Sequence, residues 1–180
     1  MRWFLQSLTH ALYDLAAHPE CLEPLREEVE TVVASDGWTK AGLNKIWKVD
    51  SFLKESHRWN GLTFSGSPYL SAVGARLLTW RVGPVSVFRK AMIDVTLRDG
   101  TKIPRGTYLA ASAVSIHHDE EKYAGTDVFD PFRFAHMREQ DDQNSTSHQF
   151  SNTSVNWLAF GHGRNAWYVV ACYVAPLIQS

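Results

Sequence analysis

The chain has 180 residues, of which 44% are hydrophobic, so it is large enough for one folded domain or for part of a larger protein. Its 18 basic and 19 acidic residues nearly cancel, and the formal net charge is -1. This balance argues against binding nucleic acid or an acidic membrane as the main activity, because no basic field exists to drive it. The two cysteines, Cys21 and Cys172, imply neither a disulfide framework nor a zinc cluster, and they favour a reducing compartment.

The first third of the chain is predicted to be helical. Leucines at helical spacing indicate an amphipathic helix that ends before Pro19, since proline disfavours the α conformation of the residue preceding it. A second helix is expected to break at Gly37, and a short one to follow over residues 39–46. We expect Asp50 to cap a further helix, which Asn60 and the glycine after it would end.

The next part of the chain has the pattern of a small sheet. Residues 85–88, 95–97 and 108–111 alternate as strands do, and Asp99-Gly100 predicts a hairpin whose two turn positions both have positive φ. A short helix is expected over residues 111–116, and the polar block Arg138 to His148 is predicted to be an exposed, mobile loop. Helices followed by a small antiparallel sheet and a long loop indicate the α+β class.

Three short motifs carry the chemistry, and each is weak by itself. In Glu55-Ser-His-Arg58, the two charged residues share a helix face, as many solvated pairs do. Arg133 stands among aromatic residues and a proline, where a buried guanidinium would need a carboxylate such as Glu55. Phe160-Gly-His-Gly-Arg164 allows a tight turn and a close approach to a flat ligand, with His162 and Arg164 able to face an anionic group.

The order of these motifs resembles the last third of a cytochrome P450, a haem-thiolate monooxygenase, of the fungal secondary-metabolism type. Further stretches share the resemblance: residues 8–17, 84–90 and 118–123. The resemblance implies the C-terminal portion of a mainly helical fold, with a small antiparallel sheet and a long meander loop. It also implies haem as the cofactor, a hydrophobic small-molecule substrate and an NADPH-dependent reductase as partner.

The resemblance also assigns roles to residues. Glu55, Arg58 and Arg133 would form a buried structural triad. Arg89 would contact a haem propionate, and Phe160, His162 and Arg164 would belong to the cofactor-binding turn; these three residues stand in the motif that normally carries the iron ligand.

The position of that ligand is where the chain departs from the family. The axial cysteine would fall at residue 167, which is Trp167, and an indole N–H cannot ligate iron as a thiolate does. Cys172 lies five residues on, in a sequence that does not resemble the family's loop, and is expected to be a small buried apolar residue. We therefore predict no metal ligand and no catalytic residue in this chain. The codons for Trp167-Tyr-Val can contain a common intron start, so a retained intron is one hypothesis for the departure.

The resemblance divides the chain into four segments. Residues 1–62 resemble the end of the central helix through the Glu-x-x-Arg helix, and residues 63–82 form an atypical insert. Residues 83–166 would contain the small sheet, the meander and the start of the haem-binding loop, and residues 167–180 form a tail unlike the family.

Two alternatives remain open. The true product could be longer and active as a haem monooxygenase, or the chain could be a non-enzymatic domain, such as a metal-binding module built from the cluster His117, His118, Asp119 and Glu120. That cluster lacks the spacing typical of a metal site. The family is usually anchored to the endoplasmic reticulum membrane, whereas this sequence shows no anchor, which predicts a cytoplasmic location.

Overall fold

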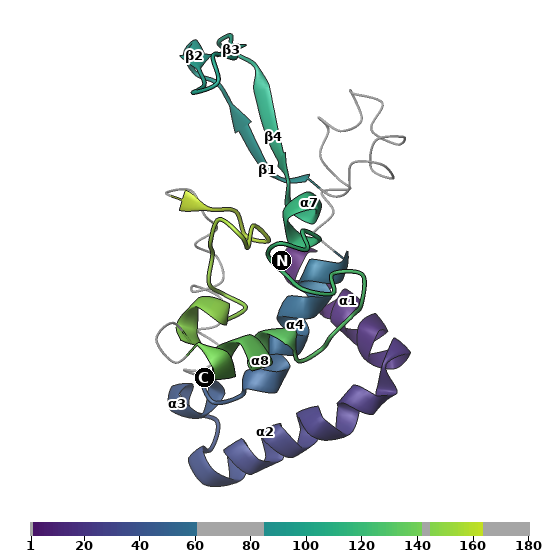
Figure 1. Ribbon diagram of the computed structural model, residues 1–180. Coiled ribbons are helices and arrows are strands. Elements are labelled where there is room, and N and C mark those ends of the chain that lie inside the picture. Colours follow the sequence, from purple (N-terminus) through teal and green to yellow (C-terminus); the bar gives the residue numbers. More distant parts are fainter. Residues whose placement is uncertain (1, 61–84, 142–144, 164–180) are drawn as a thin grey trace.

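A computed structural model describes residues 2–60, 85–141 and 145–163 of the chain. Its first part is a set of helices in which α4 packs against α1 on one side and α8 on the other, while α2 runs along the far end (Figure 1). The bounds of the first elements are α1 (Arg2–Ala17), the 3-10 helix η1 (Pro19–Cys21), α2 (Leu22–Asp36), α3 (Lys40–Leu43) and α4 (Trp47–Asn60).

Local signals set the ends of the first two long helices. Pro19 stands two residues after the last residue of α1 and begins η1. Gly37 ends α2 with φ of 66°, and its N–H donates to the carbonyl of Val33 at 3.0 Å. A positive φ costs glycine little, which is why the sequence predicted this boundary correctly.

The start of α4 differs from the prediction. The helix begins at Trp47, and Asp50 lies inside its first turn instead of capping it. The cap is Glu28 of α2, whose carboxylate accepts the free N–H groups of Trp47 and Lys48 at 2.9 Å and that of Val49 at 3.2 Å. A carboxylate at a helix N-terminus also meets the positive end of the helix dipole, so one side chain fixes α2 against α4.

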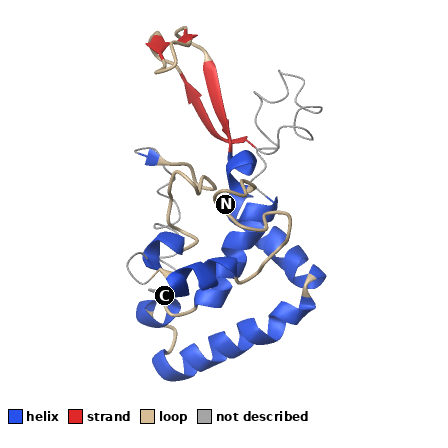
Figure 2. Ribbon diagram, in the orientation of Figure 1, coloured by secondary structure: helices blue, strands red, loops and turns tan. Residues whose placement is uncertain are grey.

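The strands form a narrow two-part hairpin that projects away from the helices (Figure 2). Strand β1 (Val85–Lys90) pairs antiparallel with β4 (Tyr108–Ser112), and β2 (Val95–Thr96) pairs with β3 (Lys102–Ile103). The prediction for the tip is half wrong: among the described residues only glycines have positive φ, so Gly100 (φ 88°) has it and Asp99 does not. The tip is a turn in which Gly100 N–H donates to Leu97 O at 3.0 Å, with the glycine alone in the left-handed region.

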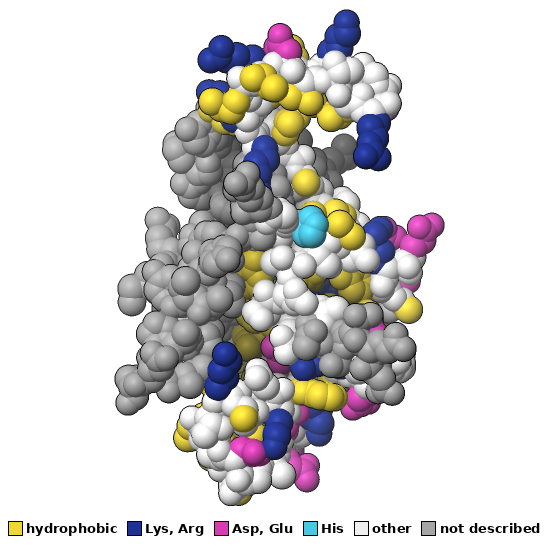
Figure 3. All heavy atoms as spheres, turned by 90° about the vertical axis from the view of Figure 1, so that its left-hand side faces the viewer, with side chains coloured by type: hydrophobic (Ala, Val, Ile, Leu, Met, Phe, Trp, Pro, Cys, Tyr) yellow, Lys and Arg dark blue, Asp and Glu magenta, His cyan; other side chains and the backbone are white. Residues whose placement is uncertain are grey.

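Large hydrophobic side chains are exposed at this end of the molecule, with Lys and Arg side chains around them (Figure 3). The exposed set includes Met92, Ile93, Leu97 and Tyr108. In the helical part, none of the helices described is both long and apolar enough to cross a membrane.

The long polar stretch after the sheet is more ordered than the sequence predicted. The short helix expected over residues 111–116 is present as α7 (Ala113–His117), and two unpredicted helices follow it, α8 (Arg133–Gln140) and the 3-10 helix η2 (Ser145–His148). The expectation of an exposed loop from Arg138 onward is wrong at its start, because Arg138 is 5% exposed and its Nη1 lies 3.4 Å from Asp50 Oδ2. Asp50, 88 residues away, stabilises the charge of Arg138, which the local sequence suggested would be exposed to solvent.

Two hydrophobic clusters form the core on either side of α4. One contains Tyr123, Phe134, Trp157, Ala159 and Phe160. The other contains Ala11, Cys21, Leu25 and Phe52. The α+β class expected from the sequence is confirmed, with helices predominating and the sheet confined to one projecting hairpin.

Candidate functional site

A buried cluster of three charged residues lies at the junction of α4 and α8. Glu55 and Arg58 are fully buried, at 0% exposure, and Arg133 is 8% exposed. Arg58 donates to both carboxylate oxygens of Glu55, from Nε at 2.7 Å and from Nη2 at 2.8 Å, and Arg133 Nε lies 3.3 Å from each of the same oxygens. One carboxylate therefore serves two guanidinium groups, and a fork-to-fork pair is the strongest geometry for such contacts.

Backbone carbonyls at the end of α7 and in the loop between α7 and α8 accept further hydrogen bonds from the two arginines. Arg58 donates to His117 O, Thr126 O and Val128 O at 3.0–3.3 Å. Arg133 donates to Gly125 O and Val128 O at 2.9 Å, and also to Ala124 O. Each donor bond made to a carbonyl offsets part of the desolvation of a buried charge, so the loop and the cluster stabilise each other.

The turn that begins at Phe160 is the second part of the site. Phe160 is 8% exposed, and its ring lies 5.2 Å from that of Phe150 and 5.7 Å from that of His57. Gly161 and Gly163 both have φ of 77°, a conformation that strains any residue with a side chain. His162 between them is exposed. The segment is thus anchored by an aromatic ring and then turns sharply outward.

His57, on the face of α4 beside this turn, is buried without a hydrogen bond. It is 3% exposed, and neither ring nitrogen has a partner among the described residues. Burial, with a smaller contribution from His10, lowers the pKa of His57 to about 3. The ring is therefore neutral at ordinary pH and behaves mainly as an aromatic neighbour of Phe150 and Phe160.

Lys54 is a second buried group on α4, directly before Glu55. It is 2% exposed, its Nζ donates to Gln149 O at 3.2 Å, and it lies 4.6 Å and 4.9 Å from the ring centres of Phe134 and Trp157. Burial is the main cause that lowers the pKa of Lys54, to about 7, while Asp50 opposes the shift and Arg138 adds to it. A charged amine held mainly by aromatic faces is less stable here than in water.

This shift predicts an alkaline dependence of stability. Since the folded pKa of Lys54 is about 7 and the unfolded value 10.5, the unfolded chain holds one more proton between them, and stability is lost as pH falls through this range. We expect a loss of up to about 1.4 kcal/mol per pH unit from pH 9.5 to pH 7.5. Urea titrations across that range should show the slope in the wild type and not in Lys54→Met. Lys40→Met, which removes an exposed lysine, should keep it.

The other predicted site residues lie elsewhere or outside the described chain. Arg89 is exposed on β1, opposite Leu109 of β4 in the projecting hairpin, and not in the buried cluster. Arg164, Trp167 and Cys172 lie outside the described residues, as do the insert 63–82 and the tail 167–180. The structure brings together Glu55, Arg58 and Arg133; the roles predicted for the other residues stay predictions.

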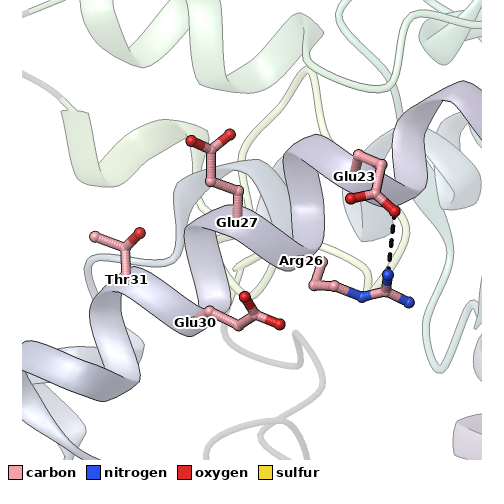
Figure 4. Close-up of a pocket in the computed structure, with 5 residues that line it drawn as sticks. All are labelled: Glu23, Arg26, Glu27, Glu30 and Thr31. Atoms are coloured by element: carbon pink, nitrogen blue, oxygen red, sulfur yellow. Dashed lines mark hydrogen bonds and ion pairs between the residues drawn. The ribbon is translucent and has the colours of Figure 1, made fainter.

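A shallow hollow lies on the surface of α2, and none of the predicted site residues lines it (Figure 4). Its lining residues all belong to that helix, and Glu23 and Arg26 form an exposed ion pair at 3.1 Å. The lining is Glu23, Arg26, Glu27, Glu30 and Thr31. Such a charged surface does not suit a flat apolar cofactor or an apolar substrate.

Among the described residues, the one cysteine, Cys21, does not lie in the cluster that contains Phe160. Within the described ranges no group of three His, Cys, Asp or Glu residues is placed to hold a metal, and this includes the cluster around His117. Cys21 packs with Ala11, Leu25 and Phe52, in the cluster that excludes Phe160, and burial raises the pKa of its thiol. A thiol with a raised pKa is a poor source of thiolate.

Sequence reasoning missed two residues that the structure places beside the cluster and the turn. Lys54 carried no local signal, because adjacent residues on a helix do not share a face and a lysine is ordinarily exposed. His117 was weighed only as a metal ligand, whereas its ring Nε2 accepts the N–H of Leu158 at 3.1 Å. Its partner is 41 residues away, so no local pattern could have indicated the contact.

Comparisons with known proteins agree on one family. The family model Cytochrome P450 matches residues 79–166. The chain is 48% identical over 160 residues to cytochrome P450 monooxygenase 151 of Postia placenta, covering 89% of this chain and 28% of that protein. It is 36% identical over 183 residues to cytochrome P450 monooxygenase CYP512U6 of Ganoderma lucidum, covering 98% and 32%. It is 38% identical over 163 residues to the ent-kaurene oxidase of Fusarium fujikuroi, covering 89% and 27%. The chain thus spans less than a third of the length of these relatives.

Proposed function

This chain belongs to the cytochrome P450 family, and from that premise we propose that it derives from a fungal haem monooxygenase but does not itself form the thiolate-ligated haem. The observation that carries the proposal is Trp167 at the axial position, shortly after a turn that keeps the family's phenylalanine and first glycine, Phe160 and Gly163. A thiolate supplies the electron density that favours cleavage of the O–O bond of dioxygen, on which the family's oxidation of its substrates depends. An indole cannot replace it, since its nitrogen only donates.

The buried cluster supports the family part of this proposal. A carboxylate shared by two arginines, with a loop wrapped around them, gives a rigid support on which a cofactor-binding turn can rest. The substrate we infer for the full-length ancestor is a hydrophobic small molecule, with electrons from NADPH through a reductase. In this chain, the buried cluster and its loop would remain folded but would not support the oxidation of a substrate.

The direct test is haem reconstitution. The purified chain, mixed with haem, reduced and exposed to carbon monoxide, is expected to show no thiolate-type absorption band. Full-length monooxygenase 151 of Postia placenta, treated in parallel, is the positive control. A thiolate-type band from this chain would overturn the proposal. Trp167→Cys alone is not expected to restore oxidation, because residues 168–180 do not resemble the helix that follows the ligand in the family.

An active haem monooxygenase is the second candidate, in which the true gene product differs from this sequence after Ala166. Phe160 is buried and Gly161 and Gly163 take positive φ, so the turn is formed from Phe160 to Gly163. Sequencing of the transcript across the codon of Trp167 separates the two candidates. A splice at this codon favours the active form, and an unspliced transcript favours the inactive one.

A further inference from the structure

His117 stands between the buried charged cluster and the Phe160 turn. It is the last residue of α7 and is 1% exposed. Its backbone carbonyl accepts from Arg58 Nη1 at 3.0 Å, and its ring Nε2 accepts from the backbone N–H of Leu158 at 3.1 Å. One residue therefore joins the guanidinium of the cluster to the segment that leads into the turn.

The ring of His117 also packs on the residue before Leu158. Its centroid lies 4.6 Å from that of Trp157, with an angle of 22° between the planes. Trp157 is 1% exposed, and its indole N–H donates to Phe150 O at 3.3 Å. The segment is thus held at both Trp157 and Leu158, three and two residues before Phe160, so small shifts of the His117 ring are transmitted to the turn.

We propose that His117 is a positioning residue for the Phe160 turn, whose neutral ring fixes the Trp157–Phe160 segment against Arg58. The hydrogen bond from Leu158 requires a lone pair on Nε2, which places the ring proton on Nδ1. That atom has no partner among the described residues. If Nε2 were protonated, its N–H would face the backbone N–H of Leu158, and the hydrogen bond between the two residues would be lost. The inference does not depend on haem, and it stands whether or not the chain is catalytic.

The surroundings of the ring favour its neutral form. Burial is the main cause that lowers the pKa of His117, to about 3. Four further groups act in the same direction, in the order Arg58, His118, His57 and Lys54. All four groups are or can become positively charged, and this disfavours a further positive charge on the ring of His117. The ring therefore stays neutral, with Nε2 able to accept a hydrogen bond, throughout the physiological range of pH.

A pair of substitutions separates the two contacts of the ring. His117→Gln keeps an acceptor near the position of Nε2 and loses the aromatic stack, whereas His117→Phe keeps the stack and loses the acceptor. Native-state hydrogen exchange should show the Leu158 amide exchanging roughly tenfold faster in His117→Phe than in the wild type, the ratio expected for a hydrogen bond of ordinary net strength. In His117→Gln its rate should stay close to the wild-type value.

The Ala135 amide serves as the internal reference, because it donates to the buried Ser51 Oγ at 3.1 Å and reports general opening of the fold. His136→Gln, at an exposed histidine, is the control variant. Equal protection of Leu158 in His117→Phe and wild type would overturn the proposal, as would equal loss in both His117 variants. If His117→Phe does not fold, the ring ¹⁵N shifts of the wild type decide, since the proposal requires the Nδ1-protonated tautomer and an Nε2-protonated ring refutes it.

Discussion

Glu55→Gln is expected to lower the free energy of unfolding by about 3–5 kcal/mol, the range for removing one partner of a buried ion pair. The substitution keeps the shape of the side chain but removes the charge that Arg58 and Arg133 share. Both guanidinium groups would stay buried, with only carbonyl oxygens around them. Carbonyl dipoles satisfy N–H groups but do not neutralise two positive charges. Urea unfolding followed by circular dichroism measures the change.

The chain offers a matched control for that measurement. Glu23 and Arg26 form an ion pair on α2 with the same spacing of three residues, but their side chains are 78% and 53% exposed. Glu23→Gln should change the free energy of unfolding by no more than about 0.5 kcal/mol, because solvent screens the pair. Arg133→Met should be milder than Glu55→Gln, since Glu55 then keeps its two bonds to Arg58. Equal effects of Glu55→Gln and Glu23→Gln would mean that the buried charges do not stabilise the fold.

The ends of the helices were predictable where the signal is local. Pro19 and Gly37 act through their own backbone, so the break between α1 and α2 and the end of α2 could be located from the sequence. The start of α4 could not, because its cap comes from Glu28, which is 19 residues before Trp47. Asp50 is a residue type that often caps helices, but its carboxylate accepts instead from the backbone N–H of Phe150, 100 residues later in the chain.

The candidate site, like the helix ends, was predictable only where the signal is local. The pairing of Glu55 with Arg58 follows from helix geometry, and the aromatic residues around Arg133 indicate that it needs a carboxylate. The carbonyls that surround both arginines belong to a polar segment with no periodic pattern, so only the folded chain shows them. α8 was missed for a related reason: Arg138, near its end, looks like a surface residue until Asp50 is seen beside it.

Acidification is expected to destabilise the fold well above the pH at which carboxylates titrate. The pKa values of His57 and His117 are both about 3 in the folded chain, against 6.5 for the unfolded one. Between these values the unfolded state binds up to two more protons, so stability rises with pH there and is lost as pH falls from 6.5 towards 3. The two residues together should contribute a slope of up to about 2.7 kcal/mol per pH unit, at about 1.4 for each proton.

His57→Phe isolates half of this effect. From pH 6.5 to pH 5.5, above the pKa of ordinary carboxyl groups, its stability should fall less steeply than that of the wild type by up to about 1.4 kcal/mol per pH unit. His136→Gln, which removes an exposed imidazole, should keep the wild-type slope. At pH 7 the variant should be at least as stable as the wild type, because the phenyl ring fits beside Phe150 and Phe160 and carries no unpaired nitrogen. If the stabilities of His57→Phe and the wild type fall equally with pH in urea titrations, the protonated form of His57 must have a partner that stabilises it. A loss of stability at pH 7 would instead mean that the imidazole nitrogens are bonded, which identifies the Phe160 turn as more polar than its aromatic neighbours indicate.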